Sequence, residues 1–412
     1  MRRLAVPLCA LVLLAPASPA LAQGSDASLR ASLAASMRAA GPASGAYVRD
    51  AGDGRTLYAV RAGVPRILAS NTKIFTTAAA LGRLGAAETL TTRVLGSGTL
   101  GPDGTWRGDL YLRGGGDPSF GSSSFVRRAY GTGASVDALA AKLEVGGITA
   151  VRGRVRGDEG LFDELRGGPD SGYRVSRDVG PLAALSFDRG LANPRGSAFQ
   201  VNPPAFAAAR LSEALERRDV DVRSAAREGA TPADAIELAS VESPPVARLV
   251  QITNKRSDNF FAETLLKRLS ARAGTPGTTA AGAGVAARVG RNLGARVRLA
   301  DGSGLSRANR ASSRAVATAL ERLRERDEFP AFYESLPIAG RDGTLSDRMR
   351  RGPARARCRA KTGTLRDVST LSGYCSTIGG DTVVFSILMN RVGPAGARRL
   401  QDRMVSAIAR RR

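Results

Sequence analysis

The chain has 412 residues and no histidine, and its 61 lysines and arginines against 37 aspartates and glutamates give a formal net charge of +24. The absence of histidine excludes Ser-His-Asp and Cys-His catalysis and argues against a catalytic zinc site. The length exceeds what one hydrophobic core usually supports, which predicts several domains or one domain with a large insertion.

The first 22 residues have the three parts of a signal peptide. An Arg-Arg start is followed by an apolar stretch at 4–14 and an A-x-A cleavage signal at 20–22. We therefore expect cleavage near Ala22 and export to the periplasm, the cell exterior or the wall. An uncleaved anchor is the alternative, although the apolar stretch is short and two prolines, Pro7 and Pro16, break it.

The positive charge predicts attraction to polyanions, and salt weakens such attraction. Outside the cytoplasm these polyanions are wall polymers and anionic lipid headgroups. We expect at most a peripheral association with membrane or wall, and no nucleic acid partner. An exported nucleic-acid binder remains the alternative, but aromatic residues make up only 5% of the chain and no nucleic-acid-binding motif is present.

The first third of the chain predicts an α/β unit. Apolar spacing predicts a helix at 25–40, and two strands at 46–49 and 56–60 are joined by a turn-rich segment at 50–54. A helix follows at 70–84 with a buried apolar face. From about residue 95 the pattern changes to short strand-like runs separated by glycine-rich turns, which predicts a β-rich insertion up to about residue 240.

Strong helical patterns return after the Pro-Pro pair at 244–245. The expected helices lie at 246–253, 259–269, 281–293 and 313–324. The expected strands lie at 355–364, 370–377 and 382–390, before a last helix at 396–409. The Ala-, Gly- and Thr-rich tract at 271–284 is expected to form a loose loop.

Without histidine, a serine nucleophile needs another base, and Ser70-Asn71-Thr72-Lys73 supplies one. In a helix that begins at Ser70, residues i and i+3 share a face, so the Lys73 amine reaches the Ser70 hydroxyl. The free N–H groups of a helix N-terminus also favour a developing anion. An N-cap serine with a surface lysine is the alternative, but Ile74 and Phe75 follow at once in a largely apolar helix.

Two further motifs complete a candidate site. Ser257-Asp258-Asn259 offers a hydroxyl for proton relay and an amide to hold a substrate, although alone it is an ordinary helix cap. Lys361-Thr362-Gly363-Thr364 lies on an expected strand, where the lysine and threonines suit a terminal carboxylate and the glycine lets a ligand backbone approach. Alone it is an ordinary exposed strand end.

Together and in this order the three motifs resemble the S-x-x-K, S-D-N and K-T-G set of penicillin-recognising serine enzymes. Over nearly the whole chain after the signal segment the sequence is similar to the class C low-molecular-mass penicillin-binding proteins, the D-alanyl-D-alanine carboxypeptidase/endopeptidases. The likeness extends to the stretches at 108–118, 301–307, 336–345 and 371–374. From the residues alone those stretches indicate only turns.

The resemblance implies an α/β (α+β) fold, a penicillin-binding transpeptidase or β-lactamase-like domain with a five-stranded antiparallel sheet between helices. It also implies a large insertion between the first two motifs. We therefore expect a discontinuous catalytic domain at 23–94 and 241–412 and an inserted β-rich region at 95–240.

The resemblance further implies a serine DD-peptidase that acts on peptidoglycan stem peptides without a metal or cofactor. Ser70 is expected to attack the carbonyl between two D-alanines, with Lys73 as base, its pKa lowered by burial and by the charge of Lys361. Ser257 would relay the proton to the leaving amine and Asn259 would position the substrate.

The same resemblance assigns the substrate's terminal carboxylate to Lys361, Thr362 and Thr364. It gives the oxyanion to the backbone N–H groups of Ser70 and Thr364. β-Lactams are expected to acylate Ser70 and to leave it slowly, as covalent inhibitors.

Two alternatives on the function stay open. A β-lactamase or esterase of the same fold would need a group that activates the deacylating water, and no short-range carboxylate motif for one stands out. A non-catalytic wall-binding module would leave the three motifs unexplained.

The signal peptide contains Cys9, which leaves Cys358 and Cys375 in the mature chain. They lie three positions before Lys361 and three positions after Ser372. If the two strands pair Lys361 with Ser372, the cysteines face each other and a disulfide is feasible; two buried thiols are equally compatible. The run at 410–412 is expected to be a solvated tail or a contact to an anionic surface.

Overall fold

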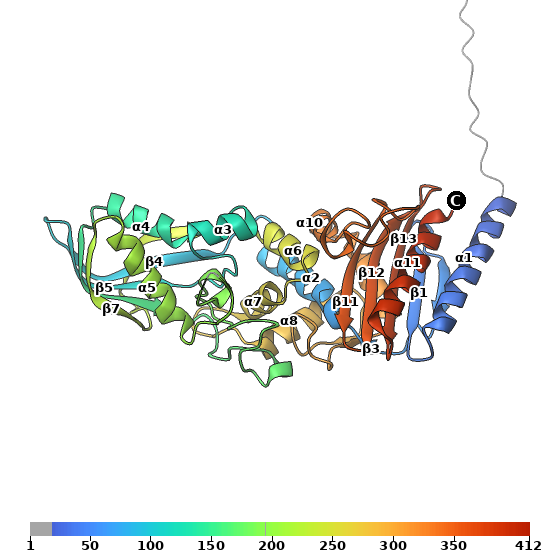
Figure 1. The fold of residues 1–412 in the computed structure, drawn as a ribbon, viewed down its shortest axis with the longest axis horizontal. Coiled ribbons are helices and arrows are strands. Elements are labelled where there is room, and N and C mark those ends of the chain that lie inside the picture. The colour runs from blue at the N-terminus through green and yellow to red at the C-terminus, as the bar shows by residue number, and fades with distance from the viewer. Residues whose placement is uncertain (1–18, 194) are drawn as a thin grey trace, which may run out of the picture.

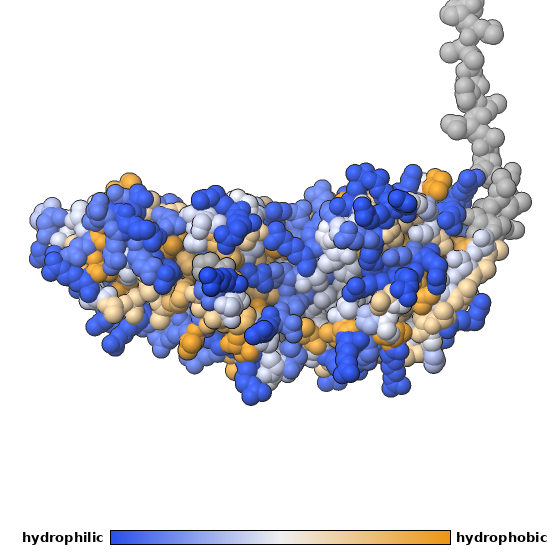
Figure 2. Space-filling view, viewed as in Figure 1, coloured by the Kyte–Doolittle hydropathy of each residue, from blue (hydrophilic) through white to orange (hydrophobic). Residues whose placement is uncertain are grey.

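The computed structural model describes residues 19–193 and 195–412, with side chains from Asp26 onward. The signal-peptide prediction falls almost wholly on residues outside this range and stays a prediction. The body is elongated, with one five-stranded sheet at each end and a group of helices between them (Figure 1). Hydrophilic residues cover much of the face seen in this view (Figure 2). Within the described residues, no helix combines the length and apolar character needed to cross a membrane.

The first sheet is wholly antiparallel and contains the predicted hairpin near the N-terminus. In spatial order its strands are β11 (Cys358–Leu365), β12 (Val368–Ser376), β13 (Thr382–Asn390), β1 (Gly45–Asp50) and β2 (Thr56–Val60). Eight of the nine residues of β12 and eight of the nine of β13 are buried, which explains the nearly unbroken apolar sequence of β13. Strand β11 is an edge of this sheet, with only β12 beside it.

Helices cover both faces of this sheet. Helices α1 (Pro19–Ala39) and α11 (Pro394–Arg410) lie side by side on one face, as Figure 1 shows at the right of the molecule. Leu33, Ile387 and Met404 meet there in one buried apolar cluster. Helix α9 (Ser313–Leu323) contacts the same strands from the other face.

The central helices pack around buried phenylalanines, including Phe75, Phe260 and Phe332. The group consists of α2 (Thr72–Leu84), α6 (Val246–Lys255), α7 (Asn259–Ser270), α8 (Thr279–Asn292) and α10 (Phe329–Ser335). Three short strands lie nearby: β3 (Arg66–Ile67), β10 (Arg310–Ala311) and β9 (Val297–Arg298).

The predicted loop at 271–284 is wrong in its second half, because α8 begins at Thr279. The Thr278 hydroxyl accepts the N–H of Ala281 and caps the helix. Gly282 lets α8 approach α7 closely, since a Cβ there would lie 2.1 Å from the Leu266 carbonyl oxygen. A low-propensity glycine is thus compensated by tertiary packing.

The second five-stranded sheet is mixed and has its own core around Trp106, Leu139 and Leu211. Its spatial order is β7 (Asp221–Glu228), β6 (Ala150–Asp158), β5 (Thr105–Arg113), β4 (Thr91–Leu100) and β8 (Ile236–Glu242). Strands β5, β6 and β7 are parallel neighbours, which requires crossover connections. These contain α3 (Ser123–Tyr130), α4 (Val136–Val145) and α5 (Pro203–Glu216), so the description of this region as β-rich leaves out three helices.

The chain leaves the central helices and returns to them at one place. Leu90 and Ser243 exchange two hydrogen bonds of 2.9 Å, one of them through the Ser243 hydroxyl. We propose that residues 91–242 form an inserted unit, slightly wider than the predicted 95–240. These residues hold the entire second sheet.

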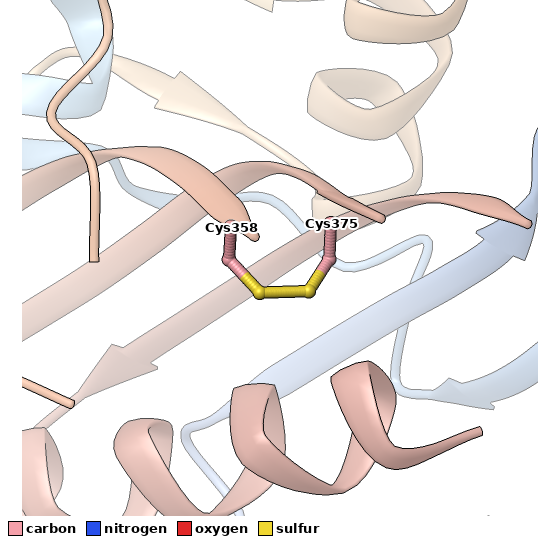
Figure 3. The surroundings of a disulfide bond; sticks show 2 residues. All are labelled: Cys358 and Cys375. Carbon is pink, nitrogen blue, oxygen red and sulfur yellow. A yellow bond between two sulfur atoms is a disulfide. The ribbon is translucent and has the colours of Figure 1, made fainter. Parts of the chain in front are cut away.

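The cysteines of β11 and β12 form a disulfide. The strands pair Lys361 with Ser372, so Cys358 lies opposite Cys375, and the bonded sulfurs lie on the side of the hairpin that faces α11 (Figure 3). The two residues are 17 positions apart. The bridge thereby fastens the edge strand three residues before Lys361.

Replacing both cysteines with alanine should lower the free energy of unfolding by about 2–4 kcal/mol, because the unfolded chain gains the entropy that the bridge removes. Urea unfolding of both proteins, each with and without reductant, measures this. Reductant should shift only the wild type. An identical wild-type midpoint under both conditions would contradict a disulfide that contributes to stability.

The expectation of a solvated tail at 410–412 is wrong for Arg411, which is buried between the exposed Arg410 and Arg412. Its guanidinium contacts three carboxylates: Asp26 at 2.8 Å, Asp50 at 2.7 Å and Asp381 at 2.6 Å. The predicted contact of this run to an anionic surface is therefore wrong for Arg411. Internal carboxylates already occupy its hydrogen-bond donors.

Candidate active site

Ser70 lies on a 3-10 turn (Ala69–Asn71) just before α2, and not on the first turn of the helix as the sequence predicted. The N–H of Asn71 bonds the Leu68 carbonyl at 3.1 Å, and Ala69 takes a left-handed φ of 46°. Gly304 lies directly against this turn, since a Cβ on it would be 1.9 Å from the Ala69 carbonyl oxygen. The tight contact explains why the regular helix starts only at Thr72.

Lys73 is fully buried, and its Nζ forms three hydrogen bonds. They run to Ser70 Oγ (3.1 Å), Asn259 Oδ1 (2.7 Å) and the Ser303 carbonyl oxygen (2.7 Å). The structure thus brings together the serine and lysine of the first motif and the asparagine of the second. The Ser303 carbonyl is a contact that the sequence analysis missed.

Burial lowers the pKa of Lys73 to about 8, although the charges of Asp301, Glu263 and Asp258 oppose this. Burial was the expected cause. Lys361 is equally buried, and burial together with the charge of Lys73 lowers its pKa well below the usual value.

Two buried carboxylates, Glu263 and Asp301, hold the loop that contacts Lys73. Glu263 Oε1 accepts the N–H groups of Gly302 at 3.0 Å and Ser303 at 2.7 Å, and Asp301 accepts that of Gly304 at 2.8 Å. These bonds fix the loop whose Ser303 carbonyl faces Lys73. Burial, together with the charge of Asp301, raises the pKa of Glu263 to about 7.

The three residues of the second motif make different contacts. Ser257 has a left-handed φ of 56° between α6 and α7, and its Oγ accepts a 2.9 Å hydrogen bond from Lys361 Nζ. Asp258 is the ordinary cap of α7, accepting the N–H of Phe261 at 3.1 Å. Asn259 binds Lys73 through its oxygen and donates its amide to the Asp178 carbonyl at 3.0 Å.

The third motif lies on β11, the edge strand. Lys361 Nζ bonds Ser257 and also the Thr362 carbonyl at 2.9 Å, and the Thr362 hydroxyl meets that of Thr344 at 2.7 Å. Thr364 is exposed, and its hydroxyl accepts a 3.2 Å hydrogen bond from Arg398. The edge position leaves backbone groups of β11 available for an added strand.

Gly363 packs closely against the protein's own backbone. A Cβ at this position would lie 2.2 Å from Thr370 Oγ1 and 2.9 Å from the Ser70 backbone nitrogen. The glycine thus lets β11 approach the Ser70 turn. Its expected contact with a ligand backbone stays a prediction.

Asn71 joins the Ser70 turn to the sheet and was also missed. Its amide donates to the Lys361 carbonyl at 2.9 Å, and its oxygen accepts the Ser372 hydroxyl at 2.7 Å. All three residues are buried. The sequence did signal that Asn71 is close to Ser70, but it gave no sign of the partner strand.

The inserted unit reaches the site through Arg189 and Asp178. Arg189 forms an ion pair with Asp258, and its guanidinium lies 5.3 Å from the centre of the Phe260 ring. Asp178 receives the Asn259 amide. Residues of the inserted unit thus hold the second motif, in addition to the helices α6 and α7 that flank it.

The arrangement can perform acyl transfer. A hydroxyl touches a buried amine whose pKa is near neutrality, and a second amine touches a second hydroxyl. Within residues 19–193 and 195–412, no cluster of three or more His, Cys, Asp or Glu residues could hold a metal ion.

Comparison with known proteins identifies the family. The sequence signature of the D-Ala-D-Ala carboxypeptidase 3 (S13) family matches residues 26–195 and 189–411. The chain belongs to this family. It is 30% identical to a D-alanyl-D-alanine carboxypeptidase of Actinomadura sp. (strain R39), over 95% of this chain and 86% of that one. It is also 30% identical to a carboxypeptidase of Mycobacterium tuberculosis, over 85% and 76% of the two chains.

Solved structures of similar proteins show the same fold. Penicillin-binding protein 4 of Haemophilus influenzae superposes with a TM-score of 0.78 at 21% identity, covering 92% of this chain and 99% of that one. A predatory endopeptidase of Bdellovibrio bacteriovorus gives a TM-score of 0.56 at 19% identity, covering 89% and 93%.

These findings confirm the resemblance and the expected fold class. As a member of the S13 family the chain is a serine hydrolase of the D-Ala-D-Ala carboxypeptidase type, acting on peptidoglycan peptides. Membership in this family overturns the alternatives of a non-catalytic wall-binding module and of a nucleic-acid binder. It favours the peptidase over a β-lactamase of related fold.

Proposed function

We propose that this protein cleaves the bond between two D-alanines, at the ends or cross-links of peptidoglycan peptides, through an acyl-enzyme on Ser70. The observation that carries the proposal is the 3.1 Å contact between the Ser70 hydroxyl and the buried Lys73 amine. Beside it, Lys361 and Ser257 form a second amine–hydroxyl pair at 2.9 Å.

The surroundings of Lys73 suit a neutral base. A neutral amine has two N–H groups and one lone pair, whereas an ammonium has three donors. Asn259 and Ser303 offer two acceptors, which satisfy the two N–H groups. The lone pair of the neutral amine then points to the third partner, the Ser70 hydroxyl, and takes its proton as Oγ attacks.

Neighbouring groups stabilise the oxyanion and deliver a proton to the departing amine. The backbone N–H groups of Ser70 and Thr364 stabilise the oxyanion. Ser257, bonded to Lys361, relays a proton to the departing amine. Water then hydrolyses the ester at Ser70 and restores the enzyme.

The substrate's terminal carboxylate is placed at Lys361, Thr362 and Thr364. The exposed edge of β11 lets the peptide add as a further strand, with its backbone hydrogen-bonded to the sheet. The Arg398 bond to the Thr364 hydroxyl brings another positive charge to this place.

β-Lactams are proposed as covalent inhibitors that acylate Ser70. The Haemophilus influenzae protein has been solved in complex with a β-lactam, and a Bdellovibrio bacteriovorus endopeptidase has been solved acylated by penicillin G. The shared fold supports the same chemistry here. We further propose export after cleavage near Ala22, and a peripheral association with wall or membrane through the net charge of +24.

The rate of acylation by a chromogenic β-lactam should rise with pH and level off above about pH 8, because only the neutral Lys73 acts as base. Below that pH the neutral fraction falls about tenfold per unit, so the rate at pH 6 should be roughly one hundredth of the plateau. Stopped-flow kinetics between pH 5 and 9.5 measures this, in roughly half-unit steps.

The Arg189→Gln variant should move this rise to higher pH. Without its ion pair the negative charge of Asp258 acts more strongly on Lys73 and raises the pKa of the amine. A rate independent of pH in both proteins would contradict Lys73 as the base.

Incubation with purified muropeptides tests the proposed reaction. Monomeric pentapeptides should lose one D-alanine, and cross-linked dimers should be cut to monomers if the protein is also an endopeptidase. Ser70→Ala should do neither. Intact pentapeptides after treatment with the folded wild type would overturn the proposal.

A further inference from the structure

The inserted unit contains a hollow of about 340 Å³ between α3, α5 and the segment at 187–193. We call it the insertion hollow. Its apolar wall includes the rings of Phe125, Phe187 and Phe206. Its polar lining includes the hydroxyls of Ser122 and Ser124. Its size and mixture of rings and polar groups are typical of a small-ligand site.

The charges of the insertion hollow are largely balanced, unlike those of the chain as a whole. Arg210 pairs with Glu213 at 2.8 Å, and Arg217 pairs with Asp137 at 2.9 Å. These pairs leave little free charge to attract a polyanion. The contacts indicate an uncharged polar ligand with an apolar face.

Arg128 is the donor that remains. It is exposed and lines the insertion hollow, with its guanidinium 5.7 Å from the centre of the Phe125 ring, and among the described residues no carboxylate forms an ion pair with it. Opposite in charge is Asp188, which accepts the N–H of Ser122 at 2.8 Å. The two provide one donor and one acceptor beside the aromatic rings.

A single turn joins the insertion hollow to the candidate active site. Asp188 lines the hollow, and the next residue, Arg189, forms the ion pair with Asp258 of the second motif. Both have left-handed φ angles, 47° and 60°. A ligand in the hollow would therefore contact the same turn whose Arg189 pairs with Asp258, the residue between Ser257 and Asn259.

We infer that the insertion hollow binds a sugar ring of the peptidoglycan glycan strand, while the attached peptide occupies the Ser70 site. This inference rests on the proposed function. The flat apolar face of a sugar ring would lie against Phe125, because Arg210 already lies over the ring of Phe206 and Phe187 is buried. The hydroxyl and acetamido groups of the sugar would bond Arg128, Ser124 and Asp188. Such a sugar ring carries no charge, which matches the largely balanced charges of the insertion hollow.

Binding of peptide-free glycan strands tests the inference without any catalysis. The Ser70→Ala protein, titrated calorimetrically with glycan strands freed of peptide by an amidase, should bind. Arg128→Gln, which removes the free donor, and Ser124→Trp, which fills the hollow, should each weaken binding at least about fivefold, as expected for the loss of one hydrogen bond or more. Both positions are accessible: Ser124 and Arg128 are exposed.

Arg127→Gln is the matched control, since Arg127 is exposed on the same helix but does not line the hollow. It should bind glycan as Ser70→Ala alone does. In the active enzyme, Arg128→Gln should slow cleavage of glycan-linked peptides and leave cleavage of sugar-free peptides unchanged. No glycan binding, or equal weakening by Arg127→Gln, would overturn the inference, whereas failure of the proposed function would abolish cleavage of both substrates.

Discussion

Replacing Ser70 with alanine should lower the rate of D-alanine release by roughly four to six orders of magnitude, the loss typical of a removed nucleophile. The fold should stay intact, because Ser70 lies half-buried on a short turn whose backbone bonds do not use its hydroxyl. Lys73→Met should cause a loss of similar size, since the hydroxyl then has no base within reach. Release of D-alanine from a synthetic pentapeptide, followed by mass spectrometry, measures both.

Ser197→Ala is the matched control for this experiment, because Ser197 is exposed and belongs to the inserted unit. It should keep wild-type activity. If the Ser70→Ala protein retained activity within about tenfold of the wild type, another nucleophile would have to carry the reaction.

Replacing Arg411 with alanine should destabilise the protein by about 3–5 kcal/mol, the usual cost of leaving buried carboxylates without their partner. Asp26 and Asp50 are nearly as buried as Arg411, with side chains 6% and 7% exposed. Asp26 keeps its ion pair with Arg55 at 2.8 Å, so most of the cost falls on Asp50, whose buried charge loses the guanidinium. Chemical denaturation followed by circular dichroism measures the change.

Arg410→Ala removes the same charge from the exposed neighbouring position and should change stability by less than about 0.5 kcal/mol. Equal effects of the two substitutions would show that the charge of the tail matters and the buried cluster does not.

Much of the fold follows from local patterns. The hairpin of β1 and β2, the helices after Pro245 and the three C-terminal strands all have apolar spacing that matches their final burial. Helix α8 matches the expected helix at 281–293 except at its start, because its first turn depends on a threonine cap and a close packing partner on α7. Helices α3 and α4 have serine caps, Ser122 and Ser135, that the sequence displays, but the helices have only 8 and 10 residues and lie among glycine-rich turns.

The candidate site was likewise predicted only in part. The motifs predicted which residues meet, and the structure places Ser70, Lys73 and Asn259 in contact, and Ser257 with Lys361. The contacts of the Ser303 carbonyl and of Arg189 could not be predicted from the sequence. Both residues belong to segments far from the motifs along the chain, and only the folded backbone brings them to the site. The same holds for Gly363, whose close neighbour is the Ser70 turn.

The account depends on Ser70 becoming acylated with Lys73 as its base. Peptide mapping of penicillin-treated protein tests this directly, because a stable acyl group adds a known mass to one peptide. We predict one penicillin per chain, on Ser70 within the peptide that continues into Lys73, and none in the Lys73→Met protein. A label on any other residue, or no label on the folded wild type, would contradict it.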